Sequence, residues 1–354
     1  MSKLKFALVG CGSIARKHAN ALHNYLEDAE IAAFVDRDLA RAQEFSNKYG
    51  APAFSSIDEM MRSVGDRIDV FSVLTPSGVH CENVLKLAEY GRPIVVEKPM
   101  ALRLEDADRM IESCDMHGVK LFVVHQNRYN PPIVKAREAL DHGRMGRLAL
   151  GTVRLRWTRD QKYYDSESWR GTWRYDGGVF MNQAAHHIDM LTWFFGPVES
   201  VRAMAATRLV TIECEDTGVA VVRFESGALG VIEATTAARP KDLEGSLSIL
   251  GENGSVVIGG FFMNDLVTWN FADKQASDDT VWTMHGKNLP EFNNLGEYLR
   301  DVIASVRTKK AALVDGLAGR RSLELITALY ESVETDSDVQ IRFRPKKCRL
   351  GVAS

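Results

Sequence analysis

The chain has 354 residues, more than one hydrophobic core usually organises, so we expect two domains. Its composition, 45% hydrophobic and 26% charged, is that of an ordinary globular protein, and no run approaches the roughly 18 apolar residues of a membrane span. The net charge of -3 argues against a nucleic-acid partner, and five scattered cysteines without a CxxC pair predict neither a disulfide framework nor a metal site. The first residues lack a signal-peptide layout, so we expect a cytoplasmic protein.

The first third alternates short apolar runs with helical patterns, as the doubly wound parallel sheet of an α/β fold requires. We therefore predict a Rossmann domain over residues 1–125, with six strands and helical crossovers. The pattern locates five of these strands, at Lys5–Gly10, Ile31–Asp36, Asp69–Thr75, Pro93–Glu97 and Lys120–His125. Helices are expected after the first two strands, and at His80–Tyr90 and Glu105–His117.

The pattern changes after Pro131-Pro132, and we assign residues 126–354 to a second, α+β domain. Alternating runs joined by short turns such as Glu225-Ser226-Gly227 predict consecutive hairpins and hence a largely antiparallel sheet. The strands are expected at Arg147–Trp157, Val219–Phe224, Ala228–Thr235, Leu243–Leu250 and Ser255–Ile258. The helices are expected at Ile133–Asp141, Gly178–Phe195, Leu295–Thr308 and Leu317–Glu334.

A glycine-rich turn follows the first strand. The segment Gly10–Ala15 has the pattern GxGxxA, in which two glycines let the backbone approach a pyrophosphate and a small third residue permits close helix packing. A tight turn alone would need only the glycines, but the strand–turn–helix context favours a dinucleotide. The expected contacts are Gly10, Gly12, Ser13, Ile14 and Ala15.

Asp36 ends the second strand, where an acidic residue usually accepts hydrogen bonds from the adenosine ribose. Because a carboxylate there repels a 2′-phosphate, the cofactor is predicted to be NAD. Arg37 beside it weakens this preference, since an arginine can accommodate the phosphate of NADP.

Glu97-Lys98-Pro99 lies at the carboxyl end of the strand Pro93–Glu97, where ligands bind in open α/β sheets. A lysine there can donate to a substrate hydroxyl and stabilise a developing alkoxide. A solvated surface turn would explain the same residues equally well.

Arginines and aromatic residues are dense between Arg159 and Arg174. Such a mixture suits a ligand with anionic and planar parts, although an interface or loop-packing cluster has the same composition. The candidates are Arg159, Tyr163, Tyr164, Trp169, Arg170 and Trp173.

The predicted helix Gly178–Phe195 carries Asn182, His186 and Asp189 at helical spacing, so we expect them on one face. A histidine between an amide and a carboxylate can serve as an oriented general base. His187 forms a second such pair with Gln183, and the spacing does not decide which histidine acts. A polar packing role is the alternative. With a lysine and a histidine but no metal-ligand cluster, the residues favour metal-free alcohol oxidation.

Several motifs together resemble the glucose-fructose oxidoreductase/inositol dehydrogenase/MocA family over nearly the whole chain. They are GxGxxA, Thr75-Pro76-Ser77-Gly78-Val79-His80, Glu97-Lys98-Pro99, Arg128-Tyr129-Asn130-Pro131 and His186-His187-Ile188-Asp189. The resemblance implies a Rossmann domain followed by an α+β domain with an open, mainly antiparallel sheet used for homo-oligomer contacts, in a dimer or tetramer. It also implies Lys98 and His186 as the catalytic pair, with Asp189 supporting His186. The implied cofactor contacts are Thr75, Pro76, His80, Glu97, Lys98 and Gln126, and the implied substrate contacts include Lys98, Arg128, Asn182, Gln183 and His186.

Asn182 departs from the family, which often has an aspartate at this position. A neutral amide can hold a hydroxyl but cannot act as a base, so the proton acceptor is expected to be His186 or Lys98. The segments around Tyr163-Tyr164, Trp169–Trp173 and Met181–Gln183 are similar to a subgroup that oxidises C3 of UDP-N-acetylglucosaminuronate for surface polysaccharide. The resemblance therefore implies a UDP-sugar as the substrate.

Two other functions fit the residues. One is oxidation of an inositol or a free sugar, whose substrates carry no pyrophosphate and would not need several arginines. The other is a sensor that binds NAD without doing chemistry, which would have no reason to keep both Lys98 and His186.

Overall fold

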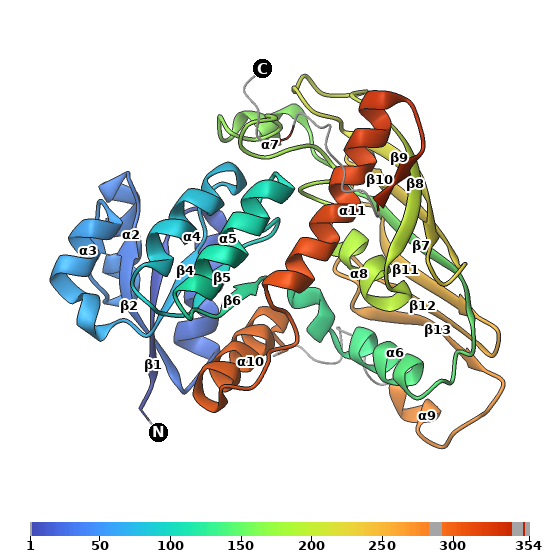
Figure 1. Ribbon diagram of the computed structural model, residues 1–354, viewed down its shortest axis with the longest axis horizontal. Helices are drawn as coiled ribbons and strands as arrows, with labels where there is room; N and C mark the ends of the chain where they lie inside the picture. The colour runs from blue at the N-terminus through green and yellow to red at the C-terminus, as the bar shows by residue number, and fades with distance from the viewer. Residues whose placement is uncertain (1, 283–291, 342–349, 351–354) are drawn as a thin grey trace. The chain divides into compact units, whose positions relative to one another are not determined.

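The computed structural model describes residues 2–282, 292–341 and 350, which fall into two compact units (Figure 1). The first unit contains Met1–Gln126 together with Asn293–Arg320, and the second contains Asn127–Phe292 together with Arg321–Ser354. The chain first passes from one unit to the other after Gln126, within one residue of the expected domain boundary after residue 125. A later segment, Asn293–Arg320, returns to the first unit, which a single division does not include.

The first unit is built on a parallel sheet of six strands in the order β3-β2-β1-β4-β5-β6, so the predicted Rossmann architecture is confirmed. The chain runs outward from β1 on one side and then returns to start again at β4. Right-handed crossovers in opposite directions put helices on both faces. The strands are β1 (Leu4–Val9), β2 (Ala29–Val35), β3 (Ala53–Phe54), β4 (Val70–Val73), β5 (Ile94–Val96) and β6 (Leu121–Val123). Its helices are α1 (Ser13–Asn20), α2 (Leu39–Tyr49), α3 (Ile57–Val64), α4 (His80–Ala88), α5 (Leu104–Met116) and α10 (Asn294–Thr308).

Helix α10 joins the first unit through charged groups at its C-terminal end. The Lys120 ammonium, next to β6, donates to the carbonyl oxygens of Ser305 (2.9 Å) and Lys310 (2.8 Å). Arg307 binds the Asp28 carboxylate at 2.6 Å. A cation at the C-terminus of a helix satisfies its last carbonyl groups and opposes the negative end of its dipole.

The second unit contains an eight-stranded sheet in the order β13-β12-β11-β7-β10-β9-β8-β14. Strands β7 and β10 run parallel and the other neighbours run antiparallel, so the mainly antiparallel sheet is confirmed. The strands are β7 (Leu148–Arg156), β8 (Val198–Ala206), β9 (Thr217–Phe224), β10 (Leu229–Thr235), β11 (Glu244–Gly251), β12 (Gly254–Gly259), β13 (Asp265–Phe271) and β14 (Val339–Gln340). The helices are α6 (Pro131–Asp141), α7 (Gln161–Asp165), α8 (Ala185–Phe195) and α9 (Asp278–Val281), and α11 (Gly316–Thr335) begins in the first unit and continues here.

Helix α8 packs on one face of this sheet, against β7 and β11 (Figure 1). The contact is close, because a Cβ added to Gly151 of β7 would lie 2.5 Å from the Phe195 ring. Within the described ranges, no helix combines the length and the apolar character that a membrane crossing requires.

Candidate active site

The glycine-rich turn has the geometry that a dinucleotide needs. Gly10 adopts φ +101°, and a Cβ there would lie 2.7 Å from the backbone of Leu74 and Thr75. Gly12 is the N-cap of α1 and leaves the first turn of the helix without a side-chain cap, and a Cβ on it would meet no atom within 4 Å. The open space and the uncapped N–H groups fit a pyrophosphate. Ser13, Ile14 and Ala15 form the first turn of α1, as predicted.

Asp36 lies beside this turn. One carboxylate oxygen accepts the backbone N–H of Cys11 at 2.8 Å, and the other accepts the N–H of Asp38 at 2.9 Å. The structure therefore brings the predicted ribose ligand to the glycine-rich turn, while the adjacent Arg37 is exposed.

The loops after β4 and β5 are joined by His80, which is fully buried. Its Nε2 lies 2.8 Å from the carbonyl oxygen of Thr75, and its Nδ1 lies 2.9 Å from that of Pro99. Burial lowers the pKa of His80, although these two hydrogen bonds oppose the change. The ring thus fixes Thr75-Pro76 relative to Lys98-Pro99, and we now expect it to shape the cofactor site from beneath.

Glu97 also points into the protein. Its carboxylate contacts Nε2 of the buried His18 at 2.8 Å and accepts the backbone N–H of Lys98 at 3.1 Å. Burial would raise the pKa of Glu97, but its interactions with His18 and Lys98 together outweigh burial and lower this pKa. Sequence reasoning gave His18 no role, although its place on the apolar face of α1 could have indicated a buried polar partner.

The segment before His186 differs from the prediction. The helix expected over Gly178–Phe195 begins only at Ala185, so Asn182 lies in the preceding turns and shares no helical face with His186. The backbone hydrogen bonds change register there: the N–H of Asn182 binds the carbonyl of Gly178 at 2.9 Å, but the N–H of Ala184 binds the carbonyl of Val179, five residues back, at 2.8 Å. Glu215 anchors these turns, since its backbone carbonyl accepts the N–H of Val179 and its carboxylate accepts the N–H of Phe180, both at 3.0 Å.

Of the two adjacent histidines in the first turn of α8, His186 is partly exposed and His187 is 1% exposed. The His187 ring packs edge-on against Trp157 with centroids 5.8 Å apart. A general base must reach its substrate, so this difference favours His186.

Asp189 and Arg128 form a buried pair in the second unit. The Arg128 guanidinium donates to both carboxylate oxygens, at 2.9 and 2.6 Å, and stacks over Trp193 at 5.0 Å. Because Arg128 is buried and its Nε/Nη2 edge is bound to Asp189, we now expect Arg128 to support the site from within the protein. Gln126 and Arg128 both belong to the short helical turn Gln126–Tyr129.

The arginine and aromatic candidates divide into two groups. Arg170 and Arg159 both stack on the Tyr163 ring, with Cζ 4.2 and 5.2 Å from its centroid, and Arg170 also lies 4.9 Å from the centroid of Trp169. Tyr164 and Trp173 are buried, where they contact Thr236 and Tyr330. The first group thus holds two guanidinium groups, of which that of Arg159 also lies 3.4 Å from the Asp242 carboxylate, and Tyr164 of the second group packs edge-on against Tyr163.

Glu215 is a buried acid behind the turns that precede α8. One oxygen accepts the Phe180 N–H and the Tyr330 hydroxyl at 2.8 Å, and burial raises the pKa of Glu215 to about 7. Between pH 4.5 and 7 the folded state then holds a proton that the unfolded state has lost, so stability falls as pH rises.

In the wild type, this proton release should lower the free energy of unfolding by roughly 2–3 kcal/mol between pH 5 and pH 8. Glu215→Gln should abolish this decrease, because the amide does not titrate. Urea denaturation of the variant and the wild type at both pH values measures the difference. An unchanged dependence on pH in the variant would contradict the assignment.

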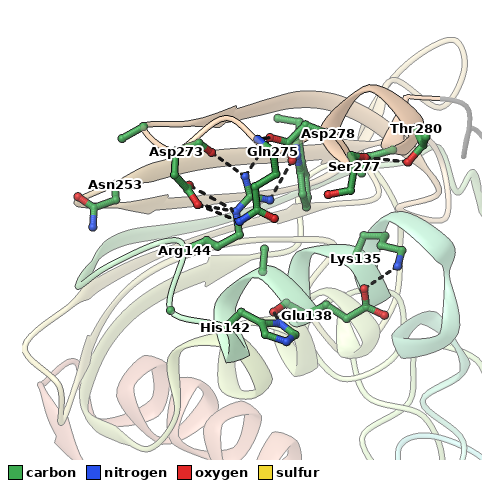
Figure 2. A pocket seen from close by; sticks show the side chains of 15 residues that line it. Lys135, Glu138, His142, Arg144, Asn253, Asp273, Gln275, Ser277, Asp278 and Thr280 are labelled. Atoms are coloured by element: carbon green, nitrogen blue, oxygen red, sulfur yellow. Dashed lines mark hydrogen bonds and ion pairs between the residues drawn. The ribbon is translucent and has the colours of Figure 1, made fainter.

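A cavity of about 840 Å³ lies elsewhere in the second unit (Figure 2). It is bounded by α6 and by the segment from β13 to α9. Arg144 crosses its wall to bind Asp273 at 3.3 Å and Asp278 at 2.9 Å, which holds that segment in place. No predicted site residue lines it. Among the described residues, no cluster of three histidine, cysteine or acidic side chains could hold a metal ion.

Comparisons with known proteins cover most of the chain. Residues 4–125 match the model of an oxidoreductase family with an NAD-binding Rossmann fold, GFO/IDH/MocA, and residues 133–257 match its C-terminal domain. The WlbA dehydrogenase from Bordetella pertussis, solved in complex with NADH and UDP-GlcNAcA, is 41% identical, with a TM-score of 0.92 over 96% of this chain and 98% of that chain. The WlbA protein from Chromobacterium violaceum, solved with the same two ligands, is 39% identical, with a TM-score of 0.88 over 96% of both chains. Myo-inositol 2-dehydrogenase of Thermotoga maritima is 26% identical over 96% of this chain and 98% of its own length.

Proposed function

The chain belongs to the GFO/IDH/MocA oxidoreductase family, as its motifs predict, and from this premise we propose its reaction. It is an NAD-dependent dehydrogenase that oxidises the C3 hydroxyl of UDP-N-acetylglucosaminuronate to the 3-keto sugar. The observation that carries this proposal is the 41% identity, over 96% of the chain, with a dehydrogenase whose structure holds NADH and UDP-GlcNAcA. The two arginines stacked on Tyr163 support it, because the substrate carries a pyrophosphate and a carboxylate.

The catalytic roles follow from residue chemistry. When bound, NAD supplies the acceptor for the hydride that leaves C3. His186 takes the proton of the C3 hydroxyl, and Lys98 donates a hydrogen bond that orients this hydroxyl and stabilises the developing alkoxide. Asn182 and Gln183 hold neighbouring hydroxyls, and Arg159 and Arg170 bind the anionic groups. Asp189, paired with Arg128, supports His186 by fixing the helix that carries it.

Asp36 is expected to set the choice of cofactor. NAD should bind at least about tenfold more tightly than NADP, a difference of about 1.4 kcal/mol, because the carboxylate repels a 2′-phosphate. Asp36→Ala should narrow this gap, and titration of both cofactors by intrinsic fluorescence measures it. Equal or tighter binding of NADP to the wild type would overturn the prediction.

The test of the reaction is incubation of the protein with UDP-N-acetylglucosaminuronate and NAD. A 2-oxo acid is added in case bound NADH needs an acceptor, and mass spectrometry follows the loss of two hydrogens from the nucleotide sugar. Myo-inositol and free hexoses are tested alongside, because the relatives include an inositol dehydrogenase. If a polyol is oxidised and the UDP-sugar is not, the proposed substrate is wrong. If NAD binds but no compound is oxidised, the result favours a sensor that binds NAD without catalysis.

We also propose that the protein assembles as a homo-oligomer, a dimer or a tetramer, through the second sheet. Val219 and Val221 on β9 and Val231 on β10 are exposed apolar side chains, although each lies in the middle of a strand. Val221 pairs with Val231, and Val219 pairs with Met204, which is 66% exposed, so the row crosses three strands. An apolar face of this kind is buried when two copies meet.

Sedimentation of the wild type should therefore give a mass of at least two chains, and Val221→Asp should shift it toward one chain. A wild type that sediments as a monomer at micromolar concentration would contradict the proposal.

The 3-keto product is what an aminotransferase needs to install a second nitrogen on the sugar. We therefore propose that the reaction belongs to surface polysaccharide synthesis and takes place in the cytoplasm.

A further inference from the structure

Asp176 lies at the centre of the segment that leads from the arginine and aromatic group to α8. Its side chain belongs to a residue that is 1% exposed. One carboxylate oxygen accepts the backbone N–H of Gly171 at 2.7 Å, and the other accepts a hydrogen bond from the side-chain amide of Asn182. A single buried carboxylate thus joins the end of the Trp169–Gly171 segment to the residue that precedes α8 by three positions.

The contact fixes which way the Asn182 amide faces. Nδ2 of Asn182 donates to a carboxylate oxygen of Asp176, since the amide nitrogen is the donor end of this side chain. The opposite orientation would place the amide oxygen against a carboxylate oxygen. With Nδ2 committed to Asp176, the amide oxygen is the atom directed away from the carboxylate, where it can accept from a hydroxyl.

Gly171 is held from two sides, which makes the link rigid. Its carbonyl oxygen accepts the N–H groups of Glu213 (3.1 Å) and Cys214 (3.2 Å), while its own N–H binds Asp176. Gly171 adopts φ +66°, and a Cβ there would lie 2.9 Å from Ile212. Any shift of Asp176 would therefore be transmitted to both ends of the segment.

We propose that Asp176 is a positioning residue that orients the Asn182 amide so that its oxygen receives a hydroxyl of the substrate. The inference rests on the proposed sugar oxidation. It explains why an asparagine, and not an aspartate, stands at 182 in this chain: a second carboxylate would face Asp176 with like charge. Asp176 itself does not contact the reacting atoms.

An exchange of the two side chains tests this role. Asp176→Asn keeps the shape of the side chain but replaces one of its two acceptor oxygens with a donor nitrogen. The value of kcat/KM for the UDP-sugar should fall roughly tenfold to a hundredfold, while the Kd for NAD stays unchanged. Asn182→Asp should be as impaired at pH 8 and should recover as the pH falls, because one proton shared by two carboxylates restores the hydrogen bond.

The double variant Asp176→Asn/Asn182→Asp should regain most of the lost activity at pH 8. An anion is not needed at position 176 in that variant, since the amide oxygen of the new side chain can take the Gly171 N–H and its nitrogen can donate to the new carboxylate at position 182. Asp165→Asn is the matched control, because Asp165 is exposed and its carboxylate accepts a hydrogen bond from the Gln161 side chain on the short helix α7. A double variant no better than the single variants would overturn the inference.

Urea unfolding of the wild type, the two single variants and the double variant separates this inference from the proposed function. The denaturation midpoint of the double variant should lie above the value expected from adding the two single shifts, and this result does not depend on any substrate. Additive shifts overturn the inference even if the UDP-sugar is oxidised. Coupled shifts in a protein that leaves the UDP-sugar untouched overturn the proposed function, and with it the role of Asp176 toward that substrate.

Discussion

Replacement of His186 by asparagine, or of Lys98 by alanine, is expected to lower kcat roughly a hundredfold or more. The first change removes the group that takes the hydroxyl proton, and the second removes the charge that stabilises the alkoxide. NAD affinity should stay near the wild-type value, since the glycine-rich turn and Asp36 are untouched. Steady-state kinetics with UDP-N-acetylglucosaminuronate and a separate NAD titration measure the two effects.

His142→Asn provides the control for this experiment. His142 is an exposed histidine at the end of α6 and has no proposed role, so its replacement should leave kcat within about twofold. If His186→Asn and Lys98→Ala both retain turnover close to the wild type, the catalytic residues lie elsewhere and the sensor function gains support.

The second large effect is expected at the buried pair of Arg128 and Asp189. Their side chains are 5% and 0% exposed, so Arg128→Met leaves a carboxylate buried without its counter-charge. This should lower the free energy of unfolding of the second unit by about 3–5 kcal/mol. All six tryptophans lie between Trp157 and Trp282, so tryptophan fluorescence during urea denaturation follows this unit.

Lys135→Met is the matched control, because it breaks an exposed ion pair with Glu138 on the neighbouring helix α6 and should cost less than about 1 kcal/mol. The double variant Arg128→Met/Asp189→Leu should be more stable than Arg128→Met, since it removes the stranded charge. A loss below about 1 kcal/mol in Arg128→Met would show that the pair contributes little.

Local patterns predict much of the fold and part of the site. The strand β1, the glycine-rich turn and Asp36 follow from neighbouring residues alone, and the structure has all three where the sequence indicates them. The predicted start of α8 is wrong because the N–H of Ala184 binds the carbonyl of Val179, five residues back, and Glu215, more than thirty residues away, anchors the turns at Val179 and Phe180. Arg128 and Asp189 are 61 residues apart in sequence, so helical spacing could not indicate their pairing.

Strands β8 and β13 do not emerge from the sequence pattern. Their side chains alternate less clearly in polarity than those of β9: Val198–Ala206 contains charged and polar residues, and both strands depend on neighbours for their hydrogen bonds. A hairpin pattern cannot predict the parallel pairing of β7 with β10 either, because α7, α8 and two strands of the same sheet separate them along the chain.

The return of Asn293–Arg320 to the first unit bears on how the protein is made. A nascent chain leaves the ribosome from its N-terminus, and domains generally fold as they emerge. Residues 1–126 emerge long before α10. Lys120 and Asp28 therefore lack their partners Ser305 and Arg307 until Asn127–Phe292 and α10 have been synthesised. A separate NAD-binding module that keeps these contacts would therefore need residues 1–126 joined to 293–320, which is an internal deletion of the chain and not a simple N-terminal fragment.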